Sequence, residues 1–299
     1  MHKENNPFIC LDCGASLNST SSDFWECSGC SKRYPIVQGI PLFVRDPNSH
    51  KAEIETAQRT NPGWYLEKQP AEECSPWRHH LKKRRLYLEK VFQSHLNSGG
   101  LEQTGNLLDL GCGDGNNLKF LNRFAQHLYG SDYNITRLVR AAVLFPEAEL
   151  FLANILDYPL KPKFFDIVFF NHVIEHIKND DLALSTIFRI LKPGGLLILG
   201  TPNEGAWWWQ LAYRLQPDTL TTTDHVHFYT AKTLAERVEN AGYKINDIHY
   251  MGWGPPNWKL DAKIRKYKWI DDWFERIGKV LIPHQASSLY LLAKKPEEN

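Results

Sequence analysis

Apolar residues in the middle of the chain alternate between short runs and helical spacing. Short runs at 107–110, 165–170 and 196–201 predict buried strands, and the nearly continuous run from Phe165 to Phe170 is typical of a central strand covered on both faces. Apolar positions three and four residues apart at 134–145 and 180–191 predict helices between them. This alternation predicts an α/β fold built on a parallel sheet.

Four further segments extend this pattern. Residues 127–132 and 149–153 read as the second and third strands, and 243–250 and 287–294 as the last two. Residues 231–241 form a helix before the last pair of strands, with Thr230 as its cap. Apolar residues at helical spacing between 253 and 284 predict a helical insertion within that pair.

The first strand runs directly into three glycines, Gly111, Gly113 and Gly115. Glycine permits positive φ and lets a ligand lie against bare backbone. A helix with Leu118, Leu121, Phe124 and Ala125 on one face is expected to follow, and its amino terminus offers free N–H groups. The spacing departs from the dinucleotide pattern G-x-G-x-x-G, and the absence of G-K-[ST] excludes a P-loop.

The stretch D-x-G-x-G-x-G from Asp109 to Gly115 resembles the loop of class I S-adenosylmethionine (SAM)-dependent methyltransferases. Three later segments, NHVIEH at 171–176, LKPGG at 191–195 and HVHFYT at 225–230, resemble the HVLEH, LKPGG and HVHFYT motifs of a group in that family that includes ubiquinone-pathway O-methyltransferases and sugar methylators. The resemblance covers about 106–242. It implies a Rossmann-like fold with a seven-stranded sheet, SAM as the cofactor and methyl transfer as the reaction.

One residue of the predicted cofactor site follows from its place at the end of a strand, and the resemblance implies the others. Asp132 ends the second strand, where an acid can accept hydrogen bonds from both ribose hydroxyls. The resemblance implies that Asn154, where the family usually has Asp, binds the adenine amino group and that the Ile155 N–H binds the ring. The complete predicted set is Asp109, Gly111, Gly113, Gly115, Asp132, Tyr133, Asn154, Ile155 and Asn171.

Histidines supply the candidate base, because methyl transfer to an unactivated hydroxyl requires its deprotonation near neutral pH. His172 follows the fourth strand directly and is the leading candidate, with His225 and His227 as alternatives. The competing interpretation is that each histidine only holds a loop. Glu175 and His176 suggest a metal, but the acids that would complete such a site are missing from the pattern, so we expect no second metal.

Four of the six cysteines form two pairs, Cys10-x-x-Cys13 and Cys27-x-x-Cys30. Two such knuckles can present four thiolates to one Zn²⁺, and the alternatives are disulfides or a redox pair. Residues 34–44 then resemble the YPI-x-x-GIP ending of a zinc-ribbon family whose members activate tRNA and protein methyltransferases. With four protein ligands the zinc would be structural. We expect the methyltransferase domain to have its own core and to bind SAM without the ribbon.

We divide the chain into a zinc ribbon (1–45), a helical linker or lid (46–103) and a methyltransferase domain (104–299) with lid insertions at about 204–224 and 253–285. The best helix of the linker is His80–Leu96. Its charge run, 82–85, is either a solvated helix face or the source of an arginine for the SAM carboxylate.

The second insertion mixes tryptophan and lysine and allows three interpretations. With Trp207–Trp209 it could roof the acceptor site and suit a sugar phosphate, since aromatic rings stack on sugars and cations meet phosphate. It could instead be a core helix, or a surface helix that contacts anionic membrane.

Composition limits the class of molecule that could accept the methyl group. A net charge of +1 with 23% charged residues leaves no dominant basic surface for nucleic acid, and Met1–Val44 has no excess of basic over acidic residues. With no signal peptide and no long apolar run, we expect a cytoplasmic protein. The sequence favours a small-molecule or sugar O-methyltransferase. The alternatives are an RNA or protein methyltransferase that reads its acceptor through the ribbon, and a SAM-binding module without catalysis, which the intact loop and acid disfavour.

Overall fold

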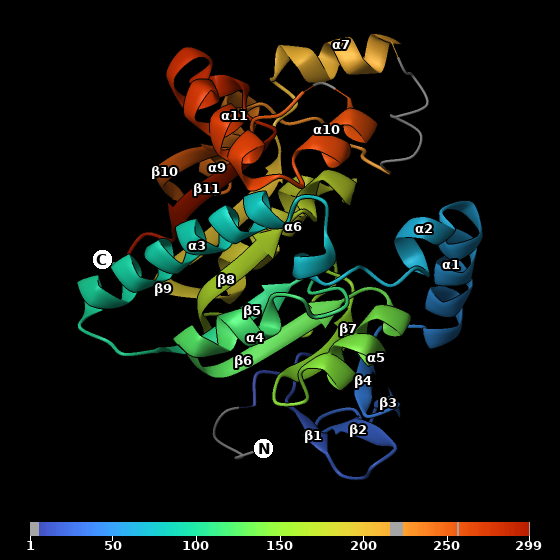
Figure 1. The fold of residues 1–299 in the computed structure, drawn as a ribbon. Coiled ribbons are helices and arrows are strands. Elements are labelled where there is room, and N and C mark those ends of the chain that lie inside the picture. The colour runs from blue at the N-terminus through green and yellow to red at the C-terminus, as the bar shows by residue number, and fades with distance from the viewer. Residues whose placement is uncertain (1–5, 216–223, 256, 299) are drawn as a thin grey trace.

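Parallel strands that follow the predicted apolar runs form the centre of one mixed sheet (Figure 1). The structure is a computed structural model and describes residues 6–215, 224–255 and 257–298. Across the sheet the order is β7-β6-β5-β8-β9-β11-β10, in which β11 and β10 are antiparallel to their neighbours. This confirms the predicted α/β fold. The strands are β5 (Thr104–Leu110), β6 (Ala125–Asp132), β7 (Glu149–Ala153), β8 (Phe165–Asn171), β9 (Leu191–Pro202), β10 (Lys244–Met251) and β11 (Ser288–Lys294).

The N-terminal segment that carries the two cysteine pairs, residues 6–45, adds four strands to the same sheet, and we call it the cysteine module. Its last strand lies parallel to β7, with Leu42 opposite Leu152 and Phe43 opposite Ala153. The described sheet therefore has eleven strands, of which seven, β5 to β11, lie within the predicted methyltransferase domain 104–299. The added strands are β1 (Leu17–Ser19), β2 (Phe24–Cys27), β3 (Arg33–Val37) and β4 (Ile40–Phe43).

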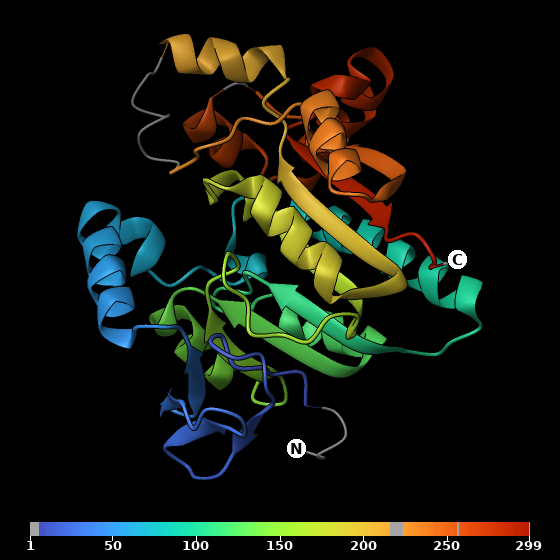
Figure 2. The same ribbon diagram turned by 180° about the vertical axis from the view of Figure 1, so that it is seen from behind.

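Helices cover both faces of the sheet (Figures 1 and 2). The long helix α3 lies on the same face as α4 and α5, whereas α6 and α9 lie on the opposite face. None of the described helices is long and apolar enough to span a bilayer. The helices are α1 (Pro47–Thr60), α2 (Pro62–Tyr65), α3 (Arg78–Gly99), α4 (Leu118–Leu121), α5 (Ile135–Leu144), α6 (Asp180–Ile190), α7 (Trp207–Leu215), α9 (Ala231–Asn240), α10 (Trp258–Ile264) and α11 (Lys268–Leu281), with short 3₁₀ turns η2 (Glu72–Cys74), η3 (Asn122–Phe124), η4 (Ile174–His176) and η5 (Pro283–Gln285).

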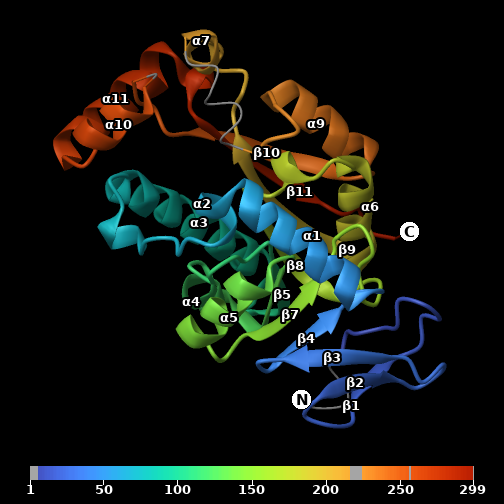
Figure 3. The ribbon, with the colours of Figure 1, turned by 90° about the vertical axis from the view of Figure 1, so that its right-hand side faces the viewer.

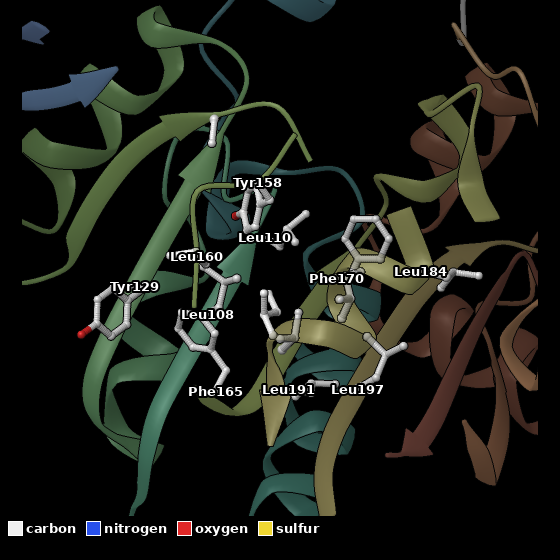
Figure 4. Close-up of a cluster of buried hydrophobic side chains, with 14 of the residues drawn as sticks. Leu108, Leu110, Tyr129, Tyr158, Leu160, Phe165, Phe170, Leu184, Leu191 and Leu197 are labelled. Carbon is white, nitrogen blue, oxygen red and sulfur yellow. The ribbon is translucent and has the colours of Figure 1, made fainter. Parts of the chain in front are cut away.

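Successive residues of the central strands face two separate apolar clusters. In β8, Ile167 and Phe169 pack with side chains of α3, α4 and α5, while Val168 and Phe170 pack with those of α6 and α9. Figure 4 shows part of the second cluster, where Phe170 lies between the sheet and α6. Burial on both faces explains why the β8 sequence is almost continuously apolar.

The cysteine module shares its core with the sheet. Phe8, Trp25, Tyr34 and Phe43 are buried in the same cluster as Phe151 of β7. The ring centroids of Phe8 and Phe151 are 5.0 Å apart. Module side chains therefore extend the core of the methyltransferase region on this side of the sheet. The expectation that this region binds SAM without the ribbon stays a prediction.

Two local predictions also change. The helix after the glycine loop is only α4 and the turn η3, because Ala125 already pairs with Thr104 as the first residue of β6. Helix α1 was not expected in the polar linker. Its start has ordinary signals, since the Asp46 carboxylate accepts a hydrogen bond from Asn48 N–H and Pro47 occupies the first turn. Of the first predicted lid insertion, 204–224, the part at 216–223 lies outside the described residues.

Candidate functional site

The glycine loop after β5 uses backbone conformations and space that only glycine supplies. The φ angles of Gly111, Gly113 and Gly115 are 79°, 54° and 84°. A Cβ on Gly111 would lie 2.3 Å from a methyl group of Val173, and one on Gly115 would lie 3.0 Å from the Cα of Ala141. The loop is thus pressed against the chain that follows β8 on one side and against α5 on the other.

Two acids mark the loop. Asp132 accepts hydrogen bonds from Gly113 N–H and Asn134 N–H, each 2.9 Å long. Asp109 is buried, and its Oδ2 has no hydrogen-bond partner among the described residues. Burial and the nearby charge of Asp132 raise the pKa of Asp109 to about 8. A buried, unpaired carboxyl oxygen beside a glycine loop suits a cationic or hydrogen-bond-donating ligand.

A buried ion pair that the sequence did not suggest supports the loop. Arg137 Nε lies 3.3 Å from Asp114 Oδ1. A Cβ on Gly113 would meet the Arg137 guanidinium at 2.5 Å. The second oxygen of Asp114 accepts a hydrogen bond from Gln69 N–H, and Asn134 Nδ2 donates to Tyr65 O. Residues 65–69 of the linker therefore lie against the loop. No spacing pattern links residues this far apart in the chain.

The residues predicted at the adenine end border a pocket of about 230 Å³ between the cysteine module, α1 and the ends of β6 and β7. Tyr133 and Asn154 line it, and Ile155 packs half-buried against the core behind it. The Tyr133 hydroxyl donates to Glu53 on α1 over 2.5 Å. Asn154 Oδ1 accepts a hydrogen bond from Leu156 N–H, which holds the loop after β7.

Arg45 joins the cysteine module to the same pocket. Its guanidinium binds both carboxylate oxygens of Asp157, at 2.6 and 3.2 Å. It also donates to Asp12 Oδ1 and to Leu11 O, within the first cysteine knuckle. No motif or spacing in the sequence assigned either Arg45 or Asp157 to a site.

His172 stands immediately after β8 in a left-handed backbone conformation, with φ of 55°. Its Nδ1 lies 3.3 Å from Oε1 of the buried Glu175, whose Oε2 accepts a hydrogen bond from Thr201. Burial opposes ionisation of Glu175, but the hydrogen bond and charge of His172 lower the pKa of this carboxyl overall. Asn171, the preceding residue, has a buried Oδ1 without a hydrogen-bond partner among the described residues. Glu175 is a functional candidate that sequence reasoning considered only for metal binding.

The other two candidate histidines differ in their surroundings. His225 packs against His176 with ring centroids 5.0 Å apart, and its Nδ1 lies 3.8 Å from Glu204 Oε1. His227 Nε2 lies 3.2 Å from the carbonyl of Lys178, a contact that holds a loop. The structure thus groups His172 and His225 around Glu175 and gives His227 a structural partner.

Glu175, His176 and His225 could also hold a metal ion, since one ligand atom from each lies within 4.8 Å of the others. The third donor is His225, whereas we expected from the sequence that a metal site would need further acids. Both oxygens of Glu175 already contact His172 or Thr201. The expected absence of a second metal stays a prediction.

The four cysteines of the cysteine module converge. All six cysteines of the chain are free, and the four Sγ atoms lie within 4.8 Å of one another. Cys10 Sγ and Cys30 Sγ are 3.7 Å apart, and Cys13 Sγ and Cys27 Sγ 3.3 Å. A tetrahedral ion with metal–sulfur bonds of about 2.3 Å requires sulfurs roughly 3.8 Å apart. The donor set therefore fits a single tetrahedral metal ion.

The charge run of α3 is not a solvated face. Lys83 forms ion pairs of 2.7 to 2.9 Å with Asp271, Asp272 and Glu275 of α11. Arg84 and Arg85 both bind Glu72. The run joins α3 to the second insertion and to η2. In the first insertion, Trp208 and Trp209 are buried and stack with centroids 4.4 Å apart, while Trp207 is exposed.

Comparison with known proteins finds methyltransferases among the similar sequences. A probable SAM-dependent methyltransferase of Mycolicibacterium smegmatis is 28% identical over 158 residues, which cover 53% of this chain and 59% of that protein. The ubiquinone biosynthesis O-methyltransferase of Maricaulis maris is 25% identical over 173 residues, covering 55% of this chain and 66% of that protein. The chain thus spans less than two thirds of these relatives' length.

A solved structure shares the fold at low sequence identity. The SAM-dependent methyltransferase of Archaeoglobus fulgidus superposes with a TM-score of 0.51 at 16% identity, over 72% of this chain and 94% of that one. This likeness confirms the Rossmann-like architecture. The model of the methyltransferase domain family matches residues 77–248, more than half of the sequence. The chain belongs to the methyltransferase domain family.

Proposed function

We propose that this protein transfers the methyl group of SAM to a hydroxyl group of a small molecule. One observation carries the proposal: the glycine loop after β5 touches the residue that follows His172. Strands β5 and β8 are neighbours, and a Cβ on Gly111 would lie 2.3 Å from Val173. A cofactor held by the loop would therefore lie beside the His172–Glu175 pair.

SAM would be bound by the backbone of the glycine loop and by the carboxylates of Asp132 and Asp109. Asp132 would accept hydrogen bonds from the ribose, and Tyr133, Asn154 and Ile155 would enclose the adenine. The unpaired oxygen of Asp109 would face the positively charged end. Bound SAM would supply an activated methyl group on a sulfonium, a leaving group that needs no acid.

His172 would act as the base. Its Nδ1 faces Glu175, so the Nδ1–H tautomer leaves Nε2 to accept a proton. During methyl transfer the hydroxyl proton of the acceptor would pass to Nε2. Glu175 then stabilises the imidazolium, a role that its charge and its hydrogen bond from Thr201 support. Proximity and alignment supply most of the rate enhancement.

For the acceptor we propose a sugar or sugar phosphate. Support comes from the resemblance of the segments at 171–176, 191–195 and 225–230 to those of the sugar methylators. We do not favour an RNA or protein acceptor read by the cysteine module, because the module adjoins β7 whereas His172 follows β8, beyond β6 and β5.

We also propose that the cysteine module binds one structural Zn²⁺ through Cys10, Cys13, Cys27 and Cys30. Zinc suits four thiolates in a tetrahedron. With all four coordination positions taken by cysteine, none is left for water or substrate, so the zinc would be structural. Two backbone N–H groups support the knuckles, from Asp12 to Cys10 Sγ and from Gly29 to Cys27 Sγ.

Calorimetric titration with SAM tests the proposed function. Asp132→Ala should weaken SAM binding about ten- to a hundredfold, because hydrogen bonds to a charged acceptor contribute roughly 1.5–3 kcal/mol. The matched control is Glu102→Ala, which removes an exposed acid just before β5. Unchanged affinity in Asp132→Ala, or no SAM binding by the unaltered protein, would contradict the proposal.

A further inference from the structure

Helix α11 has an apolar stripe on the side that faces away from the protein. Its inner face contains Asp271, which pairs with Lys83, and Gly278, against which the buried Trp253 packs. The opposite side carries Trp269, Trp273 and Val280 at helical spacing, with exposed fractions of 72%, 55% and 75%. A surface helix normally turns polar residues outward, so this stripe requires a separate explanation.

Basic residues surround the stripe, and the acids of the same two helices are paired with basic side chains. Asp261 and Asp271 are buried beside Arg265. Asp272 and Glu275 pair with Lys83, and each also pairs with one exposed lysine of α11, Lys268 or Lys279. The excess of exposed charge on α10, α11 and the turn between them is therefore positive. The exposed basic residues are Lys259, Lys263, Lys266, Lys268, Arg276 and Lys279.

The neighbouring helix α7 has the same apolar character. Trp207, Leu211 and Leu215 are exposed on it. Its first turn is fixed to the end of the second insertion, because Trp208 Nε1 donates to Gln285 O and Trp207 N–H donates to Gln285 Oε1. Figures 1 and 3 show α7, α10 and α11 together at one end of the molecule, far from the cysteine module.

We propose that α10 and α11 dock on the surface of an anionic lipid bilayer. Tryptophan and aliphatic side chains enter the boundary between headgroups and acyl chains, while lysines along the same helix meet acidic headgroups. Trp269, Trp273 and Val280 meet the first requirement and the six exposed basic residues meet the second. A second copy of the chain fits poorly, because a symmetric interface would bring like charges together.

Vesicle co-sedimentation of the full chain tests this docking without cofactor or acceptor, so the result is independent of the proposed methyl transfer. The protein should sediment with vesicles of phosphatidylcholine containing about one third phosphatidylglycerol, and 0.5 M salt should release it. Trp269→Ala with Trp273→Ala should weaken binding roughly tenfold per tryptophan. Lys263→Glu with Lys266→Glu should weaken it about fivefold or more per residue.

The matched control is Val143→Ala with Leu144→Ala, which removes two exposed apolar side chains from α5 at another part of the surface. Circular dichroism verifies that each variant is folded. The proposal is overturned if anionic vesicles do not retain the protein, if neutral vesicles retain it equally, or if the tryptophan variant binds like the control. A tryptophan variant that changes only a monomer–dimer equilibrium would assign the stripe to a second copy instead.

Discussion

His172 has a backbone conformation that costs free energy in any residue other than glycine. A φ of 55° is uncommon outside glycine, asparagine and aspartate, and such positions concentrate where a side chain must point in one direction. Here the conformation is held by the hydrogen bond from His172 N–H to Gly200 O and by the Glu175 carboxylate. This conformation thus places the imidazole against Glu175.

If His172 is the base, His172→Ala should reduce turnover by roughly 10²–10⁴ and leave SAM affinity nearly unchanged. Steady-state kinetics with an active acceptor, together with calorimetry, measures both quantities. Glu175→Gln should also reduce turnover, because a neutral amide stabilises an imidazolium less than a carboxylate does. His127→Ala is the matched control, since that histidine is exposed on β6 and is not a candidate base. Equal rates in His172→Ala and the control would remove His172 from the mechanism and leave His225 as the candidate.

The raised pKa of Asp109 leads to a prediction about how SAM affinity depends on pH. The pKa of this carboxyl in the unliganded protein is about 8, raised by burial and by Asp132. A positively charged ligand favours the carboxylate and lowers this pKa in the complex, so binding below pH 8 releases a proton from Asp109. SAM affinity should therefore rise with pH, by at most about tenfold per unit, and level off above pH 8.

Calorimetric titrations between pH 6 and 9 measure this dependence. The ligand's own amino group titrates in the same range, so the comparison is with Asp109→Asn, in which only the ligand contribution remains. The difference between the two profiles is the signal. Parallel profiles would show that Asp109 does not change its protonation on binding.

At the scale of elements, the sequence predicts those helices and strands whose bounds depend on residues close together in the chain. Strand β7 has its predicted bounds of 149–153, and α9 begins after the predicted cap Thr230. Helix α5 begins one residue later than predicted, because Asn134 is its cap. Apolar period and capping chemistry act within a few residues, so they can be read from sequence. The same holds for the glycine loop and the cysteine knuckles, whose spacing is local.

Pairings between elements far apart in the chain could not be predicted from the sequence. Nothing in residues 40–43 indicates that β4 joins β7 about 110 positions later, and that pairing extends the sheet from seven strands to eleven. The contacts of Asp114 with Arg137 and Gln69 likewise arise only when the chain is folded. The His172–Glu175 contact is local, but it depends on the turn η4, which apolar periodicity does not predict.

At the scale of the molecule, the cysteine module is continuous with the proposed cofactor site. Phe8 and Phe43 pack on Phe151, and β4 is hydrogen-bonded to β7. Arg45 connects the first cysteine knuckle to Asp157, in the loop that carries Asn154. From these contacts we infer that SAM binding weakens when the module unfolds, although the sequence alone favours independence.

Loss of the metal should therefore affect the whole molecule. Cys27→Ser should lower the bound zinc, measured by elemental analysis, from about one ion per chain. Because the module shares a core with the sheet, thermal unfolding should remain a single transition with a lower midpoint. SAM affinity should fall by roughly five- to a hundredfold, the usual range of coupling between sites.

Two variants separate the metal from the connection that transmits its effect. Cys74→Ser removes an exposed cysteine outside the module and should change neither zinc content nor SAM affinity. Arg45→Ala should keep the zinc, since it leaves all four thiolates, yet weaken SAM binding because Asp157 loses its bidentate partner. Two separate unfolding transitions, with unaltered SAM affinity in Cys27→Ser, would show that the module folds independently. In that case the shared core would contribute to packing but not to cofactor binding.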